Sequence, residues 1–205
     1  MGQVDLPQSL LLLRCFAMAN GSALRVVAAL LGVMVVALTL NILSGYSLNA
    51  YGLQPRSIQG LSGIAISPFL HGSIGHLLSN AVPFAVLSAL VLINGVGRYL
   101  LVSLLVCVIG GLLVWSFGRE ANHVGASGWV FGLWGYLLAQ AWYSKSLKSL
   151  AVAVLVVVFY GGMVFGFLPR YGVSFESHIF GALAGWVSAW ILRFSPASGA
   201  NRAHP

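Results

Sequence analysis

Residues 24–43 read LRVVAALLGVMVVALTLNIL, a run of twenty residues whose only charged side chain is Arg25, at its start. A hydrocarbon core about 30 Å thick needs about 20 apolar residues at the helical rise of about 1.5 Å per residue. The run is too long for the apolar core of a signal peptide, and no small-x-small cleavage pattern follows it. It therefore predicts a membrane-spanning helix.

The composition of the whole chain agrees with this reading. Of 205 residues, 59% are hydrophobic and 6% are charged, namely ten basic and three acidic side chains. Soluble domains carry about 25% charged residues, so this chain cannot cover a globular surface. The composition excludes a soluble enzyme, a disordered chain and a nucleic-acid binder, although the pI is about 9.9. The two cysteines, Cys15 and Cys107, form no disulfide framework. The lipid bilayer is the expected surrounding.

Five further apolar stretches follow the first one. The six expected spans are 24–43, 74–93, 99–117, 127–143, 150–166 and 177–194. The predicted fold is an all-α, polytopic bundle of six transmembrane helices in one domain over 24–194. We expect residues 1–23 to form a cytoplasmic N-terminal segment and residues 195–205 a cytoplasmic C-terminal tail.

The basic residues predict the orientation of the bundle. With a cytoplasmic N-terminus, seven basic residues lie inside: Arg14, Arg25, Arg98, Lys145, Lys148, Arg193 and Arg202. Three lie outside: Arg56, Arg119 and Arg170. This bias follows the positive-inside rule. We therefore expect a multi-pass protein of the cell (inner) membrane with both termini in the cytoplasm.

Polar residues gather at the outer ends of the three spans that run inward. Span two opens with HGSIGHLLSN (71–80), span four with Gly125-Ala-Ser127-Gly128, and span six with Ser177-His178. Ser127 is 16 residues before Tyr143 and His178 is 15 before Arg193, which places them about 24 and 22 Å above the inner surface. Asn80 comes out about one helical turn higher. We expect these groups to meet in one layer just beneath the outer surface.

Pairs of glycines at a spacing of four residues predict that spans four and six pack closely. Gly128 and Gly132 lie on one, and Gly181 and Gly185 on the other. Small residues at this spacing allow membrane helices to approach each other. Close packing would bring the Ser127 hydroxyl within hydrogen-bonding range of His178.

A serine hydroxyl beside an imidazole points to nucleophilic catalysis. The histidine accepts the proton of the hydroxyl and later protonates the leaving amine. Glu176 lies two residues before His178 and therefore points elsewhere on a helix, so we predict a Ser–His dyad without a carboxylate. Phe131, four residues after Ser127, is a candidate ring for stacking on His178. Candidate oxyanion donors are the Ser127 N–H, the Asn80 amide and His76.

Other interpretations remain open at this stage. His71, His76, Asn80 and His178 could line a proton or ion pathway, although spans one, three and five offer almost no polar side chains to continue it. A non-catalytic scaffold that binds membrane helices is a further alternative. A metal site is not expected, because no His-Glu-x-x-His motif and no carboxylate within a span is present, and no cofactor is expected. We interpret His71 as an interfacial side chain and His123 as an exposed loop residue.

Taken in order, these motifs resemble a rhomboid intramembrane serine protease of the minimal six-span bacterial form. The resemblance covers about residues 50–194 and rests on His71-x4-His76-x3-Asn80, Gly125-x-Ser127-Gly128 and His178-x2-Gly181-x3-Gly185. It implies that Ser127 is the nucleophile, His178 the general base, and His76 and Asn80 the oxyanion residues. It further implies a tight turn at Gly125, with supporting roles for Phe131, Gly128, Gly181 and Gly185.

The resemblance also implies the substrates, which are single transmembrane helices cut near their outer end after a small residue. Two features of the family pattern are missing. Segment 44–73 lacks the common Trp-Arg pair, and the end of span two, residues 92–98, lacks the usual acidic residue. Both features are structural in the family.

Overall fold

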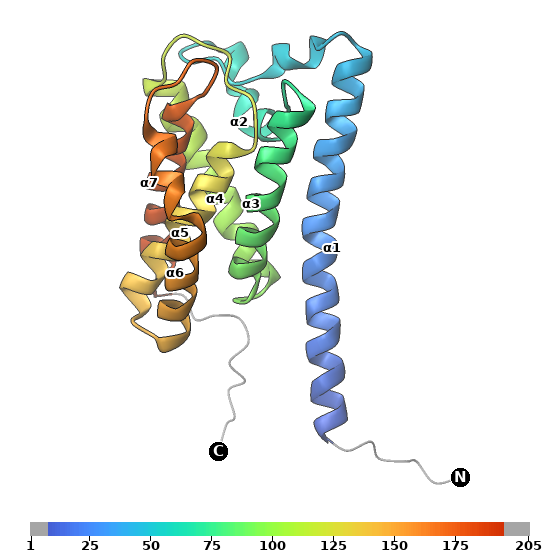
Figure 1. Cartoon of the computed structure of the whole chain (residues 1–205), viewed down its shortest axis with the longest axis vertical. Helices are drawn as coiled ribbons and strands as arrows, with labels where there is room; N and C mark the ends of the chain where they lie inside the picture. Colours follow the sequence, from blue (N-terminus) through green and yellow to red (C-terminus); the bar gives the residue numbers. More distant parts are fainter. Residues whose placement is uncertain (1–7, 195–205) are drawn as a thin grey trace, which may run out of the picture.

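The computed structural model describes residues 8–194, and in this range the chain forms α-helices and short 3-10 helices but no β-strand. The long helices are α1 (Gln8–Leu43), α3 (Ile74–Leu92), α4 (Val96–Phe117), α5 (Ser127–Ser144), α6 (Leu147–Tyr160) and α7 (Phe175–Leu192). The short ones are η1 (Ser47–Tyr51), η2 (Gln59–Leu61), α2 (Gly63–Ile66), η3 (Ser67–Phe69) and η4 (Gly161–Phe167). The long helices alternate in direction (Figure 1).

Each of the six stretches predicted from hydropathy coincides with a helix, which confirms the all-α fold. Within the described range, four segments are long and apolar enough to cross a membrane: 24–43, 74–92, 96–117 and 147–167. Helices α5 and α7 have eighteen residues each, with nine of α5 and eight of α7 buried. They are less apolar because much of their surface contacts protein and because they carry the polar residues of the site.

Helix α1 begins at Gln8, so it includes much of the segment 1–23 that the sequence placed before the first span. It stands at the edge of the bundle, beside α3 (Figure 1). Its buried Asn41 donates hydrogen bonds to Asn49 Oδ1 (2.9 Å) and to the backbone oxygen of His71 (3.2 Å). The upper end of α1 is thereby tied to the loops. The tail 195–205 lies outside the described residues.

The most extensive contact between helices joins α5 and α7, and it is made by glycine. A Cβ atom on Gly181 would collide with the backbone oxygen of Gly128, and one on Gly185 with that of Gly132. The predicted close packing of these two helices is therefore confirmed. Helix α4 covers the pair on one side.

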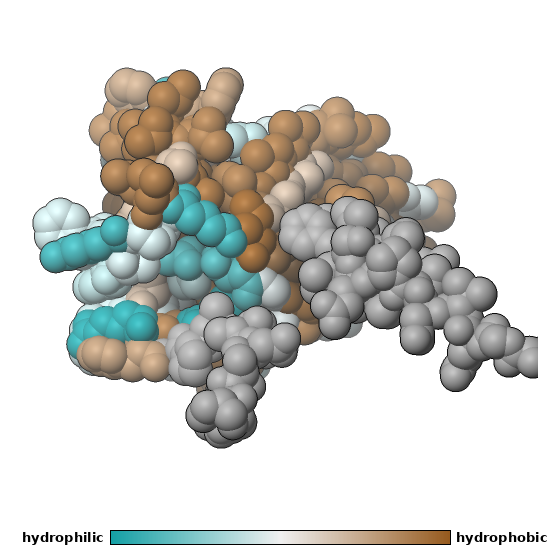
Figure 2. Space-filling model, turned by 90° about the horizontal axis from the view of Figure 1, so that it is seen from below, coloured by the Kyte–Doolittle hydropathy of each residue, from teal (hydrophilic) through white to brown (hydrophobic). Residues whose placement is uncertain are grey.

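Hydrophobic side chains cover much of the flanks when the bundle is seen from its lower end, and hydrophilic ones gather on part of that end face (Figure 2). This distribution is expected where lipid contacts the sides of a helical bundle. At the upper end lie the short helices of segment 44–73 and the loops 118–126 and 168–174 (Figure 1).

Two histidines of the upper end are placed differently from the prediction. His71 is 0% exposed and His123 is 4% exposed. The backbone of His123 pairs with that of Leu53 through two hydrogen bonds of 2.9 Å. Segment 44–73 folds over this loop and excludes solvent from it, so the expectation of an interfacial His71 and an exposed His123 was wrong.

Candidate active site

Ser127, His178, His76 and Asn80 line one cavity of about 520 Å³. Ser127 is the first residue of α5, His178 lies in the first turn of α7, and the other two lie in the first two turns of α3. The structure thus brings together the four side chains that the sequence singled out for chemistry. Pro83 of α3 and Met163 of η4 also line this cavity.

Gly125 forms the turn that presents Ser127. Its φ of +116° is a conformation that residues with a side chain rarely adopt, and its N–H donates to the backbone oxygen of Ser67 (2.9 Å). A Cβ atom here would lie 2.6 Å from His76 Nε2. Glycine is therefore required both for the backbone conformation and for the close approach of the turn to His76.

The ring of His178 is held at two points. It stacks on Phe131 with ring centroids 4.1 Å apart and an interplanar angle of 9°, which confirms the predicted stacking. Its Nδ1 lies 2.7 Å from the backbone oxygen of Gly166 in η4. Because a carbonyl oxygen can only accept, Nδ1 carries the proton, and Nε2 of the neutral ring keeps its lone pair.

Sequence reasoning did not find Gly166. A hydrogen bond to a backbone carbonyl can be made by any residue type, so the sequence does not indicate it. The need for glycine at this position follows only from the side chains packed against it in the structure. A Cβ atom at this position would lie 2.5 Å from Phe131 Cζ and 3.1 Å from His178 Nδ1. The absence of a side chain at Gly166 therefore makes room for the stacked pair.

The Ser127 hydroxyl and the His178 ring, which the sequence led us to expect within hydrogen-bonding range, form no hydrogen bond in the described structure (residues 8–194). Hydrogen bonds between catalytic groups are often long in a protein without substrate and shorten when the substrate binds. The carboxylate of Glu176 pairs with Arg119 at 3.4 Å. Among the described residues, no carboxylate hydrogen-bonds His178.

Asn80 is buried, and its amide nitrogen Nδ2 has no hydrogen-bond partner in the described part of the chain. A Cβ atom on Gly125 would lie 3.5 Å from this nitrogen, so the amide sits close to the turn before Ser127. Leaving a buried donor unpaired costs about 1–3 kcal/mol. Ser127 opens α5, and its N–H is one of the first four of the helix, which have no partner within the helix. The turn therefore gathers donors that are free to bind an oxyanion.

His71 lies directly behind His76, with the two rings edge to face at 5.1 Å between centroids. Its Nδ1 is 3.3 Å from the Phe69 backbone oxygen, while its Nε2 is buried without a partner among the described residues. Burial, and to a smaller extent the neighbouring His76, lowers the pKa of His71 from 6.5 to about 4. His71 is accordingly neutral at physiological pH.

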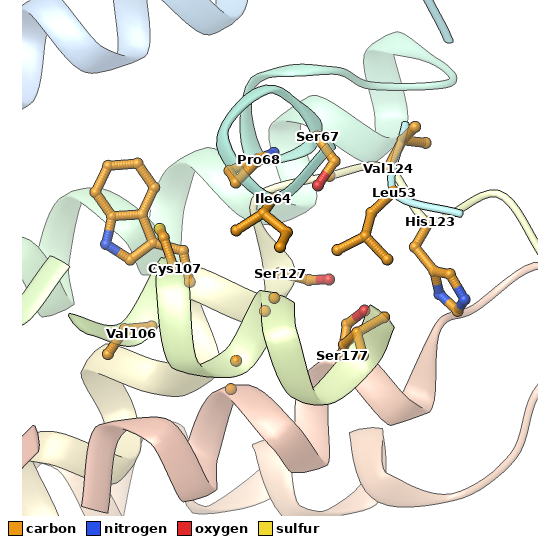
Figure 3. A pocket seen from close by; sticks show the side chains of 17 residues that line it. Leu53, Ile64, Ser67, Pro68, Val106, Cys107, His123, Val124, Ser127 and Ser177 are labelled. Carbon is orange, nitrogen blue, oxygen red and sulfur yellow. The ribbon is translucent and has the colours of Figure 1, made fainter. Parts of the chain in front are cut away.

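A second, smaller cavity of about 50 Å³ also borders Ser127. Figure 3 shows Ser127 in this cavity together with Ser67, Ser177 and His123, which come from η3, α7 and the loop before α5. The volume exceeds the minimum that a buried water requires, and the hydroxyls supply polar partners. In the part of the chain that the structure describes, no cluster of three potential metal ligands occurs.

The fold is that of a helical membrane protein, and its site holds a serine and a histidine in one cavity. Comparison with known proteins gives the family. The Rhomboid domain model matches residues 59–195, so the chain belongs to the rhomboid family.

An uncharacterized protein of Mycobacterium tuberculosis is 32% identical over 180 residues, covering 80% of this chain and 75% of that protein. RHOMBOID-like protein 5 of Arabidopsis thaliana is 31% identical over 147 residues, covering 64% of this chain and 44% of the plant protein. Membership in the family implies an intramembrane protease.

Proposed function

We propose that this protein is a serine endopeptidase that cleaves transmembrane segments within the membrane, with Ser127 as nucleophile and His178 as general base. The observation that carries the proposal is the bond from His178 Nδ1 to the Gly166 oxygen, in a ring that lines the same cavity as Ser127. This bond leaves Nε2 as the basic nitrogen of the ring, and a base is what a serine hydroxyl needs in order to attack.

The proposed reaction has two halves. In the first, Ser127 Oγ attacks the scissile carbonyl while Nε2 takes its proton, and the resulting imidazolium then protonates the leaving amine. In the second, a water attacks the acyl group while Nε2 accepts its proton, and that proton passes to Ser127 Oγ as the acyl–Oγ bond breaks and the acid product leaves. The small cavity beside Ser127 has room for such a water.

The oxyanion formed in each half needs hydrogen-bond donors. We assign this task to the Asn80 amide, the backbone N–H of Ser127 and the ring of His76. The unpaired Nδ2 of Asn80 supports the assignment, since a donor left free in the resting site can bind charge in the transition state without first breaking another bond. The N-terminus of α5 adds a favourable potential.

The substrates are transmembrane helices of other membrane proteins, cut near the extracytoplasmic face. In this proposal all six long helices span the cell membrane, both termini are cytoplasmic, and the upper end of Figure 1 faces outward. Two observations support the arrangement. Seven of the ten basic residues fall on the side assigned to the cytoplasm, and the cavity lies near the end that carries the long loops.

The alternative of an ion or proton pathway is less well supported. Below the cavity, the buried polar side chains of the described helices include serines whose hydroxyls are already engaged. Ser188 donates to the Ala184 backbone oxygen, and Ser88 lies 3.1 Å from the Tyr99 hydroxyl. A proton pathway would need groups that titrate near neutral pH at this depth, whereas a tyrosine hydroxyl titrates at about pH 10.

Cleavage of a labelled single-span substrate in proteoliposomes tests the proposal. We expect Ser127→Ala and His178→Ala each to abolish cleavage while the protein still inserts and elutes as the wild type does. Undiminished proteolysis by either variant would rule out the dyad. Absence of cleavage by the wild type, with the substrate still bound, would favour a non-catalytic scaffold.

A further inference from the structure

The side chain of Arg119 contacts the N-terminus of α7, the helix that carries His178. Its Nη2 donates to the Val173 backbone oxygen (2.5 Å), its guanidinium lies 5.3 Å from the centre of the Phe175 ring, and its Nε lies 3.4 Å from Glu176 Oε1. One side chain from the loop before α5 thus contacts three residues at or just before the N-terminus of α7.

His123 makes a second connection between the same two segments. Its Nε2 is 3.2 Å from the Arg119 backbone oxygen and its Nδ1 is 2.5 Å from Ser174 Oγ. Since the carbonyl only accepts, Nε2 carries the proton and Nδ1 accepts from the Ser174 hydroxyl. Ser174 Oγ in turn accepts the backbone N–H of Ser177 and caps α7. The neutral form of His123 satisfies every bond in this chain, and burial lowers the pKa of His123, which favours that form.

The Arg119–Glu176 ion pair is more buried than the neighbouring Arg56–Glu120 pair. The Glu176 side chain is 10% exposed, and its Oε2 is buried without a partner in the described residues. Glu120, the next residue after Arg119, pairs with Arg56 at 3.8 Å and is 91% exposed. Exposed pairs contribute about 0–1 kcal/mol, whereas a carboxylate that is buried and only partly paired is costly. A buried carboxylate with an unpaired oxygen therefore calls for an explanation other than stability, such as a role in function.

The two connected segments are the ones that deliver the catalytic groups. Ser127 follows His123 by four residues, with the turn at Gly125 between them, and His178 follows Ser174 by four residues and Glu176 by two. The segment 119–123 is also fixed on its other side, because His123 pairs with the backbone of Leu53. A shift of either segment would therefore move one catalytic side chain relative to the other.

We propose that Arg119, His123, Ser174 and Glu176 form a latch that positions His178 relative to Ser127. The proposal rests on the function proposed above. These four are positioning residues, since they act through the backbone that carries the dyad. A displacement of about 1 Å of a catalytic group can lower a rate by about 100-fold, so the latch acts on the chemical step rather than on substrate binding.

The test compares Glu176→Gln with Glu120→Gln in the full-length protein reconstituted in liposomes with a single-span substrate. The two substitutions make the same chemical change at a buried and at an exposed ion pair. The kcat is expressed per Ser127 that a serine-directed fluorophosphonate labels to completion, so that misfolded protein is not counted. We expect Glu176→Gln to lower this kcat by about 10- to 100-fold with KM within about twofold, Glu176→Asp to restore most of it, and Glu120→Gln to match the wild type.

Wild-type kcat per labelled Ser127 in Glu176→Gln would overturn the latch, even if fewer molecules were labelled, because a purely structural role lowers only that fraction. Should Glu176→Gln not fold, Arg119→Gln serves in its place, since the Arg119 side chain is almost half exposed, and the same result would overturn the latch. The two proposals are separable. Ser127-dependent cleavage with an unaffected Glu176→Gln removes the latch alone, whereas a wild type without such cleavage removes the proposed function and the latch together.

Discussion

At the scale of single residues, the site combines groups that are fixed with one that is left free. Phe131 and the Gly166 carbonyl fix the ring of His178, and the Gly125 turn fixes Ser127. The amide nitrogen of Asn80, by contrast, is buried without a hydrogen-bond partner in the described chain. A free donor beside a fixed nucleophile is the arrangement that electrostatic stabilisation of an oxyanion requires.

Asn80→Ala should therefore slow the reaction without weakening substrate binding. Removal of one oxyanion donor lowers kcat by about 10²- to 10³-fold, or about 2.7–4 kcal/mol. Steady-state kinetics with a transmembrane substrate measure this, and KM is expected to stay near the wild-type value. A kcat within threefold of the wild type would show that Asn80 is not a main donor.

His71 should make the stability of the protein sensitive to acid. Its pKa is about 4 in the folded protein and about 6.5 when the ring is exposed, so the unfolded chain binds more protons between these values. The contribution of His71 is therefore complete above pH 6.5 and is lost as the pH falls toward 4. Thermal unfolding in detergent should show a midpoint that decreases from pH 7 to pH 5.

His71→Asn is the control for this effect. Asparagine does not titrate, so the midpoint of the variant should depend less steeply on pH, although it is lower at pH 7 because a buried ring is lost. Equal slopes for the variant and the wild type would assign the acid sensitivity to other groups, with His123 the first to examine because its pKa is also lowered by burial.

At the scale of the elements, the contact between α5 and α7 decides the geometry of the site. The two helices approach so closely that the backbones at Gly132 and Gly185 touch. Because α5 carries Ser127 and α7 carries His178, the helix separation sets the separation of the catalytic groups. Larger residues in this interface would act on stability and on activity together.

Gly185→Ala should destabilise the protein, and Gly32→Ala should not. A Cβ atom on Gly185 would lie 2.7 Å from Tyr136 N, whereas no atom of the residues that the structure describes lies within 4 Å of one on Gly32 in α1. Overpacking costs about 1–3 kcal/mol, while alanine in an uncrowded helix gains up to about 1 kcal/mol over glycine. Thermal midpoints measured in one detergent test this pair, and a midpoint for Gly185→Ala at or above that of the wild type would contradict the packing argument.

At the scale of the whole molecule, the two ends of the described chain lie at the same end of the bundle, opposite the long loops (Figure 1). We predict that the loop end faces outward. In intact cells, a membrane-impermeant maleimide should label Tyr171→Cys, in the exposed loop before α7, but should label Leu147→Cys only after permeabilisation. Both experiments use a background without Cys15 and Cys107. The opposite pattern would invert the bundle.

Much of this architecture is readable from the sequence because it depends on local patterns. Hydropathy marks every long helix, and the spacing of Gly128, Gly132, Gly181 and Gly185 predicts which helices touch. Counting helical rise from Tyr143 and Arg193 places Ser127 and His178 in one layer. These signals are carried by side chains whose role follows from their neighbours in the sequence.

The features that the sequence did not reveal depend on loops that fold back on the bundle. The Gly166 carbonyl is invisible to residue-type reasoning, and the burial of His71 and His123 depends on how segment 44–73 packs. The Arg119–Glu176 pair joins residues 57 positions apart, one in a loop and one at a helix start, and no periodicity links them. Only the three-dimensional arrangement shows that they lie beside the site.

The proposed function depends above all on the activation of Ser127 by His178. Labelling of the reconstituted protein with a fluorophosphonate, followed by identification of the modified residue, tests it directly. We expect rapid labelling of Ser127 in the wild type and loss of that labelling in His178→Ala. Labelling of Ser127 at the same rate in both proteins would contradict it.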